Sequence, residues 1–421
     1  MTSLPRELSH AEQIRYATQY CARGQFDDAR VLYEAALEHV PDRLDVILRL
    51  AQLSLLANDL AAARRHAETA LRLAPDFPLP YGLLAEASYR DGDYDRAADC
   101  YRKLGRVGLA DKARQLAQTG AYACTSGAAD NSCTPFLGSG PLPVITARVQ
   151  GRAVNLVVDS AAGELLLDHA FAAACGLVSG GTERMAFAGG RKAIVQHTIV
   201  DELTLGNFTL VQVPSLSLDI TDVFAPFFDF PIHGVLGVEI LKRFTVTLDF
   251  SVGQMILDVP GSSTVPLPGQ TQRLWLAGSH YPVTAAQIGE GRPVMLLVDT
   301  GMSGADCLVA ESMSERVPVL ADPDGAVTGS GGGGEVTGRV VRLPELCVAG
   351  HCRRAVRAVV LEHFPLERQL GFRMAGMLAS DYFRNTILSF DFKRMLLGLG
   401  VGDGHVPPDR RPLGVQARKG G

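Results

Sequence analysis

The strongest constraint on the fold of this 421-residue chain is that one short sequence pattern occurs in it twice. One apolar run ends in Asp-Ser-Ala at Asp159, and a later apolar run ends in Asp-Thr-Gly at Asp299. Their length and β-branched content predict that both runs are buried strands, and the small residues that follow predict turns. Because a carboxylate at the end of a buried strand is costly unless the fold stabilises it, both aspartates are candidate functional residues.

Further landmarks follow the two aspartates in the same order and at nearly equal spacing. Each copy has a glycine pair or run, then a Gly-apolar-Leu segment, then a strand that contains Asp-Phe. These landmarks lie at residues 189–190, 234–241 and 248–250 in the first copy, and at residues 331–334, 376–383 and 390–392 in the second. This agreement indicates an internal duplication, so we expect two copies of one β-rich unit, at residues 135–262 and 263–402.

Composition limits the class of protein. Apolar residues make up 47% of the chain and charged residues 20%, which is typical of a globular protein with sizeable cores. The net charge of -5 gives no electrostatic footprint for nucleic acid or for an anionic membrane. No apolar run approaches the roughly 18 residues of a membrane span, and the first residues lack the pattern of a secretory signal. We therefore expect a cytoplasmic protein without a membrane span.

The chain has eight cysteines, too few for a dense disulfide framework at this length. Unpaired thiols in a reducing cytoplasm are the expected state. Two pairs could instead close small rings, namely Cys124 with Cys133 and Cys347 with Cys352. His351 lies between the members of the second pair, but no fourth ligand stands at zinc-finger spacing, so we expect no metal site.

The N-terminal part contains a helical repeat. Positions with the same residue character recur at a constant period: turn residues at Gly24, Asn58 and Gly92, large apolar residues at Phe26, Leu60 and Tyr94, and alanines at Ala29, Ala63 and Ala97. Each unit predicts two short helices that cross closely at the alanine, and proline ends the second helix because it cannot continue one. The pattern and its period of about 34 residues resemble the tetratricopeptide repeat.

The resemblance covers three repeats at about residues 10–105, followed by a closing helix, so residues 1–119 are expected to form a helical repeat domain. Such repeats imply a concave surface that binds a protein partner. A rigid spacer or a dimerisation arm is the alternative. Residues 120–134 are small and polar and are expected to be a linker, and residues 403–421 are expected to form a flexible tail.

The duplicated part resembles a second family. A strand ending in Asp-Thr-Gly or a close variant, a glycine-rich hairpin, a Gly-apolar-Leu segment and a strand with Asp-Phe are together similar to one lobe of a retropepsin-like aspartic peptidase. Two such lobes in one chain resemble the bilobal pepsin-like arrangement. The resemblance covers about residues 136–400. The expected fold is therefore an α-helical repeat solenoid followed by a bilobal, all-β, acid-protease-like unit.

This resemblance implies a catalytic pair made of Asp159 and Asp299. Two carboxyl groups in contact cannot both ionise, so the pair would hold one proton. The ionised member would take a proton from water, and the protonated member would give one to the substrate carbonyl oxygen. Supporting roles follow for Ser160 and Thr300, whose hydroxyls would bond across the interface between the copies, and for Gly301, which permits close backbone approach. No cofactor or metal is expected.

The glycine-rich segments are expected to be hairpin tips that close over a substrate. An extended peptide would add to them as a strand. The residues concerned are Gly189 and Gly190 in the first copy and Ser330, Gly331, Gly332 and Gly333 in the second. An ordinary hairpin loop is the alternative.

These expectations combine into a cytoplasmic aspartic endopeptidase that acts on a peptide or protein substrate, with the repeats recruiting a protein partner or that substrate. The first copy departs from the family pattern because Ala161 stands where glycine is usual. A catalytically inactive, peptide-binding adaptor with a protease-like fold is therefore the alternative function. Self-cleavage in the linker between Cys124 and Cys133 is a third hypothesis.

Overall fold

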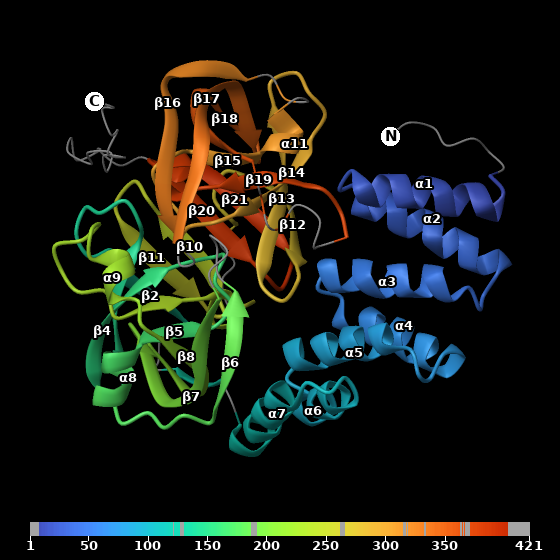
Figure 1. The fold of residues 1–421 in the computed structure, drawn as a ribbon, viewed down its shortest axis with the longest axis horizontal. Coiled ribbons are helices and arrows are strands. Elements are labelled where there is room, and N and C mark those ends of the chain that lie inside the picture. The colour runs from blue at the N-terminus through green and yellow to red at the C-terminus, as the bar shows by residue number, and fades with distance from the viewer. Residues whose placement is uncertain are drawn as a thin grey trace. The chain divides into compact units, whose positions relative to one another are not determined.

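The fold is described by a computed structural model, which covers residues 8–120, 122–126, 130–186, 192–261, 266–314, 317, 319–331, 334–362, 364, 366 and 371–402. The chain divides into two compact units. The first is built on helices from the N-terminal part, and the second is built on the strands that follow (Figure 1). The expected order, helical repeats and then an all-β region, is confirmed. Among the described residues no helix is long and apolar enough to cross a membrane.

Helices of the first unit follow each other as antiparallel pairs, α1 with α2, α3 with α4 and α5 with α6, and α7 closes the series. The small alanines predicted at the helix crossings, Ala29, Ala63 and Ala97, are all fully buried. The helix bounds are α1 His10–Ala22, α2 Phe26–His39, α3 Leu44–Leu56, α4 Leu60–Leu73, α5 Pro78–Arg90, α6 Tyr94–Lys103 and α7 Val107–Thr119.

The predicted turn residues end the first helix of each pair in a left-handed conformation. Gly24, Asn58 and Gly92 have φ of 77°, 55° and 81°, a region that glycine and asparagine adopt more readily than other residues. The following helix then begins at a cap in two of the three repeats. The side chains of Asp59 and Asp93 accept hydrogen bonds from backbone N–H groups of α4 and α6, which satisfies donors that the helix itself leaves unpaired.

The first lobe of the second unit is an eight-stranded sheet with the order β1-β8-β5-β9-β4-β3-β7-β6. Short helices α8 (His169–Ala174), α9 (Thr221–Phe224) and α10 (Val238–Leu241) connect its strands. The strand bounds are β1 Ala123–Ser126, β3 Val144–Val149, β4 Arg152–Val158, β5 Leu165–Asp168, β6 Gly181–Ala186, β7 Lys192–Leu205, β8 Phe208–Leu218 and β9 Gly234–Leu236.

A thirteen-stranded sheet contains the strands of the second lobe and, at one end, β10, β11 and β2, which come before that lobe in the sequence. Its order is β16-β17-β18-β15-β19-β14-β13-β12-β21-β20-β10-β11-β2. Helix α11 (Glu311–Ser314) and the 3-10 helix η1 (Ser380–Phe383) belong to the same lobe. The strand bounds are β2 Asn131–Pro135, β10 Thr245–Asp249, β11 Gln254–Asp258, β12 Gln270–Ala277, β13 Tyr281–Ile288, β14 Val294–Val298, β15 Cys307–Ala310, β16 Leu320–Gly331, β17 Gly334–Val348, β18 His351–Leu361, β19 Met374–Leu378, β20 Thr386–Asp391 and β21 Leu396–Val401.

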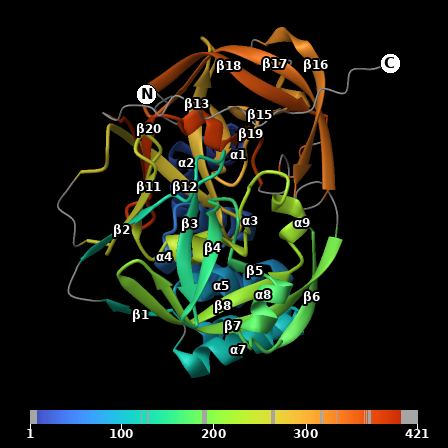
Figure 2. The ribbon, with the colours of Figure 1, turned by 90° about the vertical axis from the view of Figure 1, so that its left-hand side faces the viewer.

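Strand connectivity confirms the duplication. In the first lobe β4 runs parallel to β9, which pairs with β5, and β5 runs parallel to β8. In the second lobe β14 runs parallel to β19, which pairs with β15, and β15 runs parallel to β18. The long hairpins β7–β8 and β17–β18 lie at opposite ends of the second unit (Figure 2). Each apolar run predicted from the sequence is therefore a central strand of its lobe.

One sheet joins the lobes. Strand β10 of the first lobe pairs with β20 of the second, with Thr245 opposite Asp391 and Asp249 opposite Ile387. Asp249 ends its strand by accepting hydrogen bonds from the backbone N–H groups of Ser251 and Val252. Asp391 accepts from the backbone N–H and the side chain of Arg394. These two recurrent aspartates therefore hold turns in the shared sheet.

The segment expected to be a linker is instead partly β-structure. Strand β1 pairs with β8, with Cys124 opposite Leu210, and strand β2 pairs with β11, with Cys133 opposite Ile256. A small, polar segment can join a sheet edge because the pairing uses main-chain N–H and C=O groups rather than apolar side chains. The expected tail, residues 403–421, lies outside the described residues.

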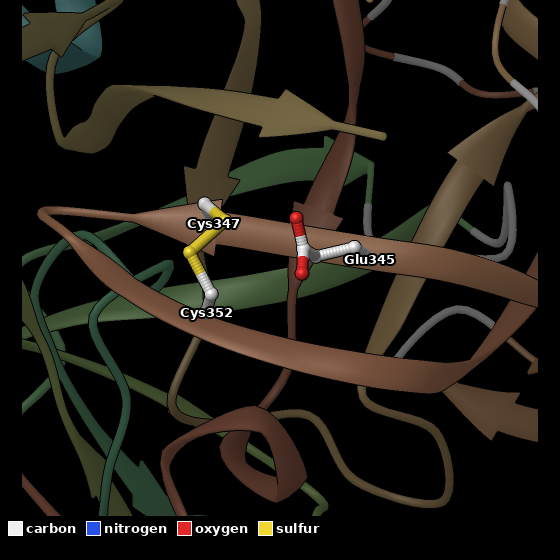
Figure 3. Close-up of side chains that lie close together, drawn as sticks. All are labelled: Glu345, Cys347 and Cys352. Carbon is white, nitrogen blue, oxygen red and sulfur yellow. A yellow bond between two sulfur atoms is a disulfide. The ribbon is translucent and has the colours of Figure 1, made fainter. Parts of the chain in front are cut away.

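Unpaired thiols were the wrong expectation for one cysteine pair. Cys347 and Cys352 form a disulfide across the β17–β18 turn, where they lie directly opposite each other (Figure 3). The carboxylate of Glu345 lies close to the two sulfur atoms, but these are bonded to each other and do not offer thiolate ligands. The remaining six cysteines, Cys124 and Cys133 among them, are free.

Replacing Ala63 by leucine should destabilise the helical unit by about 1–3 kcal/mol, because a larger side chain has no room at a fully buried helix crossing. Ala61→Leu is the matched control, since Ala61 is an exposed position of the same helix and should change stability by less than about 0.5 kcal/mol. Denaturant unfolding followed by helical circular dichroism measures both. Equal losses in the two variants would show that the crossing at Ala63 is not close-packed.

Candidate active site

Asp159 and Asp299 occupy the same place in the two lobes, directly after the central strands β4 and β14. The backbone N–H of Asp159 donates to Leu236 O at 3.1 Å, and the backbone N–H of Asp299 donates to Leu378 O at 2.9 Å. Both acceptors belong to the parallel neighbouring strand, β9 or β19. Two equivalent pairs of parallel strands, β4 with β9 and β14 with β19, therefore end close to each other, and an aspartate stands at the end of each pair.

The two carboxyl groups meet between the lobes, close enough for each to change the pKa of the other. The Asp159 carboxyl also lies against the backbone of Gly301, where an added Cβ would come within 2.2 Å of Asp159 Cγ. Glycine is therefore required at this position by space and not by backbone conformation, because Gly301 has no positive φ. Ala161, its counterpart in the first lobe, has no positive φ either, so the methyl group causes no backbone strain there.

A reciprocal set of hydrogen bonds ties the two aspartate loops together. Ser160 Oγ donates to Val298 O at 2.7 Å and accepts from Thr300 N at 3.1 Å. Thr300 Oγ1 donates to Val158 O at 2.8 Å and accepts from Ser160 N at 3.0 Å. Both side chains are fully buried. Each hydroxyl therefore satisfies one backbone donor and one backbone acceptor of the opposite lobe, and the loops hold each other in register.

Each loop is also fixed from behind by the short helix that follows the Gly-apolar-Leu segment. In the first lobe Val238 N and Glu239 N, at the start of α10, donate to Ala162 O and Gly163 O, both at 2.8 Å. In the second lobe Ser380 N, at the start of η1, donates to Met302 O at 2.8 Å. These backbone donors are unpaired within their own helix, so binding the loop satisfies them.

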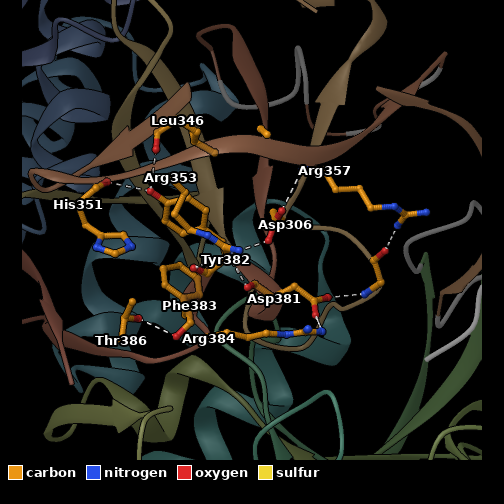
Figure 4. A network of polar contacts seen from close by, with 12 residues as sticks. Asp306, Leu346, His351, Arg353, Arg357, Asp381, Tyr382, Phe383, Arg384 and Thr386 are labelled. Atoms are coloured by element: carbon orange, nitrogen blue, oxygen red, sulfur yellow. Dashed lines mark hydrogen bonds and ion pairs between the residues drawn. The ribbon is translucent and has the colours of Figure 1, made fainter. Parts of the chain in front are cut away.

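A second support is a polar network in the second lobe that sequence reasoning missed (Figure 4). Asp381 Oδ2 accepts from Gly304 N at 2.6 Å, and Asp306 Oδ1 accepts from Arg353 Nη1 at 2.8 Å. The same Arg353 nitrogen also donates to the backbone oxygens of Asp381 and Tyr382. The network connects the loop after Asp299 to β18 and η1.

The duplication contained a signal for part of this network. Asp381 forms an ion pair with Arg384 three residues later, and at the equivalent place in the first lobe Glu239 pairs with Lys242 at 2.7 Å. An acid and a base with this spacing on a short helix recur in both copies. The contacts of Arg353 carried no such signal, because its partners are far away in the sequence.

Burial raises the pKa of both aspartates. For Asp299 the pKa lies well above its ordinary value, first because of burial and then because of the negative charge on Asp159. For Asp159 the rise caused by burial is opposed by hydrogen bonds from Ala161 N at 2.7 Å and Ala162 N at 3.1 Å. Since the charge of one group changes the pKa of the other, they titrate as a pair. The arrangement favours one proton on the two carboxyls.

Glycine-rich hairpins are present near the expected positions. Strands β6 and β7 form the hairpin of the first lobe, and its expected tip, Gly189 and Gly190, lies outside the described residues. Strands β16 and β17 form that of the second lobe, with Ser330 opposite Glu335 and Gly331 opposite Gly334. Gly332 and Gly333 lie outside the described residues.

Comparison with family models agrees with this geometry. The model of the aspartyl protease family matches twice, at residues 145–240 and 284–383. The chain carries a duplicated aspartyl protease domain. A tetratricopeptide repeat model matches residues 21–76, so the resemblance to a retropepsin-like protease preceded by such repeats is confirmed. No curated protein matches the chain at a significant level. Each copy of the aspartyl protease domain contains one aspartate of the pair.

Replacing Thr300 by valine should destabilise the aspartyl protease unit by about 2–5 kcal/mol. The change keeps the volume but leaves Val158 O and Ser160 N without their partner, and each unsatisfied buried group costs about 1–3 kcal/mol. Thr337→Val, at an exposed position of β17, is the matched control and should be nearly neutral. Denaturant unfolding measures both. A Thr300→Val protein as stable as the control would contradict the role of the hydroxyl.

Stability should depend on pH through the carboxyl pair. Because the folded-state pKa of Asp299 is raised, its contribution is fully present below the unfolded pKa and is lost as pH rises through the folded pKa. Asp299→Asn removes this loss, so the variant should gain stability relative to wild type as pH rises from the unfolded pKa toward the raised folded pKa, by about 1.4 kcal/mol for each unit of raised pKa. Melting temperatures across this range test it, with the exposed Asp229→Asn as control. A constant difference between variant and wild type would rule the effect out.

Proposed function

We propose that this protein is an aspartic endopeptidase in which Asp159 and Asp299 activate the water that attacks a peptide bond. The observation that carries the proposal is that the two aspartate loops are tied together so that two buried carboxyl groups face each other, with the pKa of both raised. Both aspartates accept hydrogen bonds from backbone N–H groups of their own turns, as the structural carboxylate of Asp249 does. What distinguishes them is that each lies against a second buried carboxyl group. Two buried acids held against each other are costly, and acid–base catalysis supplies a reason to keep them.

The proposed reaction needs one proton on the pair. The ionised carboxyl removes a proton from water while the oxygen of that water bonds to the carbonyl carbon of the substrate. The protonated carboxyl gives its proton to the carbonyl oxygen, which forms a neutral tetrahedral diol. The carboxyl that took the proton from water gives it to the amide nitrogen, and the C–N bond breaks. A hydroxyl of the diol returns its proton to the pair as the carbonyl forms again, and an acid and an amine leave. The pair ends with one proton, as it began, and neither aspartate needs a fixed individual role.

Rigid support of the pair fits this chemistry. The reacting groups have to be held within a fraction of an ångström of productive geometry. The hydroxyls of Ser160 and Thr300 fix the two loops to each other, and Gly301 leaves room for the Asp159 carboxyl. The proposed function of these three residues is therefore to position the aspartates.

The substrate in this proposal is an extended peptide. The β6–β7 and β16–β17 hairpins would cover it, with Gly189, Gly190 and Ser330 to Gly333 at their tips, and backbone groups would pair with the peptide as with another strand. The helical repeats would recruit a protein partner or the protein substrate itself, as repeat solenoids do. This second role rests on the repeat architecture alone.

A non-catalytic, peptide-binding adaptor is the second candidate, and the observation that favours it is Ala161. At the equivalent Gly301 a Cβ would overlap the Asp159 carboxyl, so a methyl group in the first lobe removes the symmetry of the pair. Self-cleavage between Cys124 and Cys133 is less favoured, because both residues lie in strands that are paired with β8 and β11 and would first have to leave them.

A cytoplasmic location stays a prediction. The six free cysteines fit a reducing compartment, whereas the Cys347–Cys352 disulfide is more typical of an oxidising one.

Asp159→Asn and Asp299→Asn should each lower the kcat for peptide cleavage on the order of 10³-fold or more, because either change removes one partner of the proton exchange. Incubation with a diverse peptide pool, from mildly acidic to neutral pH and followed by mass spectrometry, measures this. The rate should fall as pH rises through the raised pKa of Asp299, where the shared proton is lost.

Asp201→Asn, at an exposed position of β7, is the matched control for charge removal. If wild type binds peptides without cutting them, and both Asp→Asn variants bind them equally well, the adaptor replaces the peptidase. A wild type that cuts peptides and keeps cutting after either substitution would place the activity outside this pair.

A further inference from the structure

The second-lobe aspartate faces a tyrosine across the sheet. Strand β13 pairs with β14 so that Val283 lies opposite Leu297 and Thr284 opposite Leu296. Tyr281 is the first residue of β13, and the same register continued by two residues places it opposite Asp299. Directly opposed residues of antiparallel strands have their side chains on one face of the sheet. The Tyr281 side chain is therefore on the face that carries the Asp299 carboxyl.

The first-lobe aspartate faces a leucine in the same way. Strand β3 pairs with β4 so that Val144 lies opposite Val157. The hydrogen bond from Val158 N to Pro143 O, at 2.8 Å, continues this ladder beyond the end of β3. One step further places Leu142 opposite Asp159. Leu142 and Tyr281 are thus equivalent positions of the two copies, and they differ in chemistry.

Tyr281 also lies close to the seam between the lobes. Its neighbour His280 approaches Gly163, in the loop after Asp159, so closely that a Cβ there would lie 3.2 Å from His280 Nδ1. The rings of His280 and Tyr281 are 4.1 Å apart between centroids, and Ser279 Oγ is hydrogen-bonded to His280 Nδ1 at 2.7 Å. The start of β13 is therefore held against the first lobe beside the aspartate pair.

The electrostatics of Tyr281 agree with this position. Burial raises the pKa of its phenol, and the negative charges of Asp159 and Asp299 raise it further. A phenol with a raised pKa stays protonated over the whole range in which the carboxyl pair titrates, so its hydroxyl is a hydrogen-bond donor there.

The surroundings of Leu142 are apolar. Leu142 belongs to a buried cluster with Val144, Val157 and Ile232. Partly buried aromatic side chains pack against this cluster: Phe224, Phe228 and Phe230. A hydroxyl donor is absent from this set, so the residue opposite Asp159 is surrounded by hydrocarbon, whereas the residue opposite Asp299 is a phenol.

We infer that Tyr281 is a specificity-determining residue, which rests on the proposed function of the groove in holding a peptide. Its hydroxyl donates a hydrogen bond to the side chain of the peptide residue beside Asp299, so this side takes an amide or hydroxyl side chain such as Asn, Gln, Ser or Thr. An acidic side chain is disfavoured there because the aspartate pair carries a negative charge. The Leu142 side takes an apolar residue, and the difference between the sides sets the direction in which a peptide lies.

The test is a peptide pool that varies the residues on the two sides of the cleaved bond. Wild type should prefer an amide or hydroxyl residue on one side and an apolar residue on the other. Tyr281→Phe should lose the polar preference by about tenfold, the value of one hydrogen bond, while peptides that are apolar on both sides are cut as before. Exchange of the pair, Leu142→Tyr with Tyr281→Leu, should move the polar preference to the other side. Tyr81→Phe, in helix α5, is the matched control.

Affinity selection of the same pool on Asp299→Asn, with and without Tyr281→Phe, separates specificity from chemistry. If wild type cuts peptides and Tyr281→Phe keeps the wild-type preference, the inference is wrong and the peptidase stands. If wild type cuts nothing but the polar preference in binding is lost with Tyr281→Phe, the peptidase is wrong and the inference stands. If no protein cuts or binds any peptide, both are wrong.

Discussion

The hydrogen bonds of Ser160 and Thr300 are the interaction on which the site depends. Each aspartate loop leaves a backbone N–H and a neighbouring carbonyl that its own lobe does not satisfy, and the hydroxyl of the other lobe binds both. Because all of these groups are buried, separating the lobes would leave several of them unpaired at once. The lobes can therefore hold two carboxyl groups together although these groups repel when both are charged.

Holding two buried carboxyl groups together costs free energy of folding, and interactions elsewhere in the fold offset this cost. Burial raises the pKa of both groups, and main-chain donors oppose the rise in both loops: Ala161 and Ala162 for Asp159, and Gly301 and Met302 for Asp299. The negative charge of Asp159 raises the pKa of Asp299 further. The environment is thus uneven before any substrate is present, with Asp299 the better holder of the shared proton. The network of Asp306, Arg353 and Asp381 adds rigidity on the Asp299 side.

Sequence reasoning succeeded where the signal was local or repeated. The helical repeats and the duplicated β-rich region followed from periodicity and duplication. The proximity of Asp159 and Asp299 was expected from the resemblance to the protease family. It failed where geometry depends on residues far apart in the chain. Strands β1 and β2 join sheet edges through main-chain bonds that their side chains do not encode, and Arg353 finds partners only once β18 and η1 are in place. The need for glycine at Gly301 was expected from close approach, but that the neighbour is the Asp159 carboxyl became visible only in three dimensions.

Carrying both lobes on one polypeptide has an evolutionary consequence. In a protease assembled from two identical subunits, every substitution is present in both subunits, so a tyrosine beside one aspartate would also lie beside the other. Here the shared sheet through β10 and β20 joins halves that are encoded separately. A mutation can therefore change the residue opposite one aspartate and leave the equivalent residue opposite the other unchanged. Leu142 and Tyr281 are equivalent positions at which the two copies already differ.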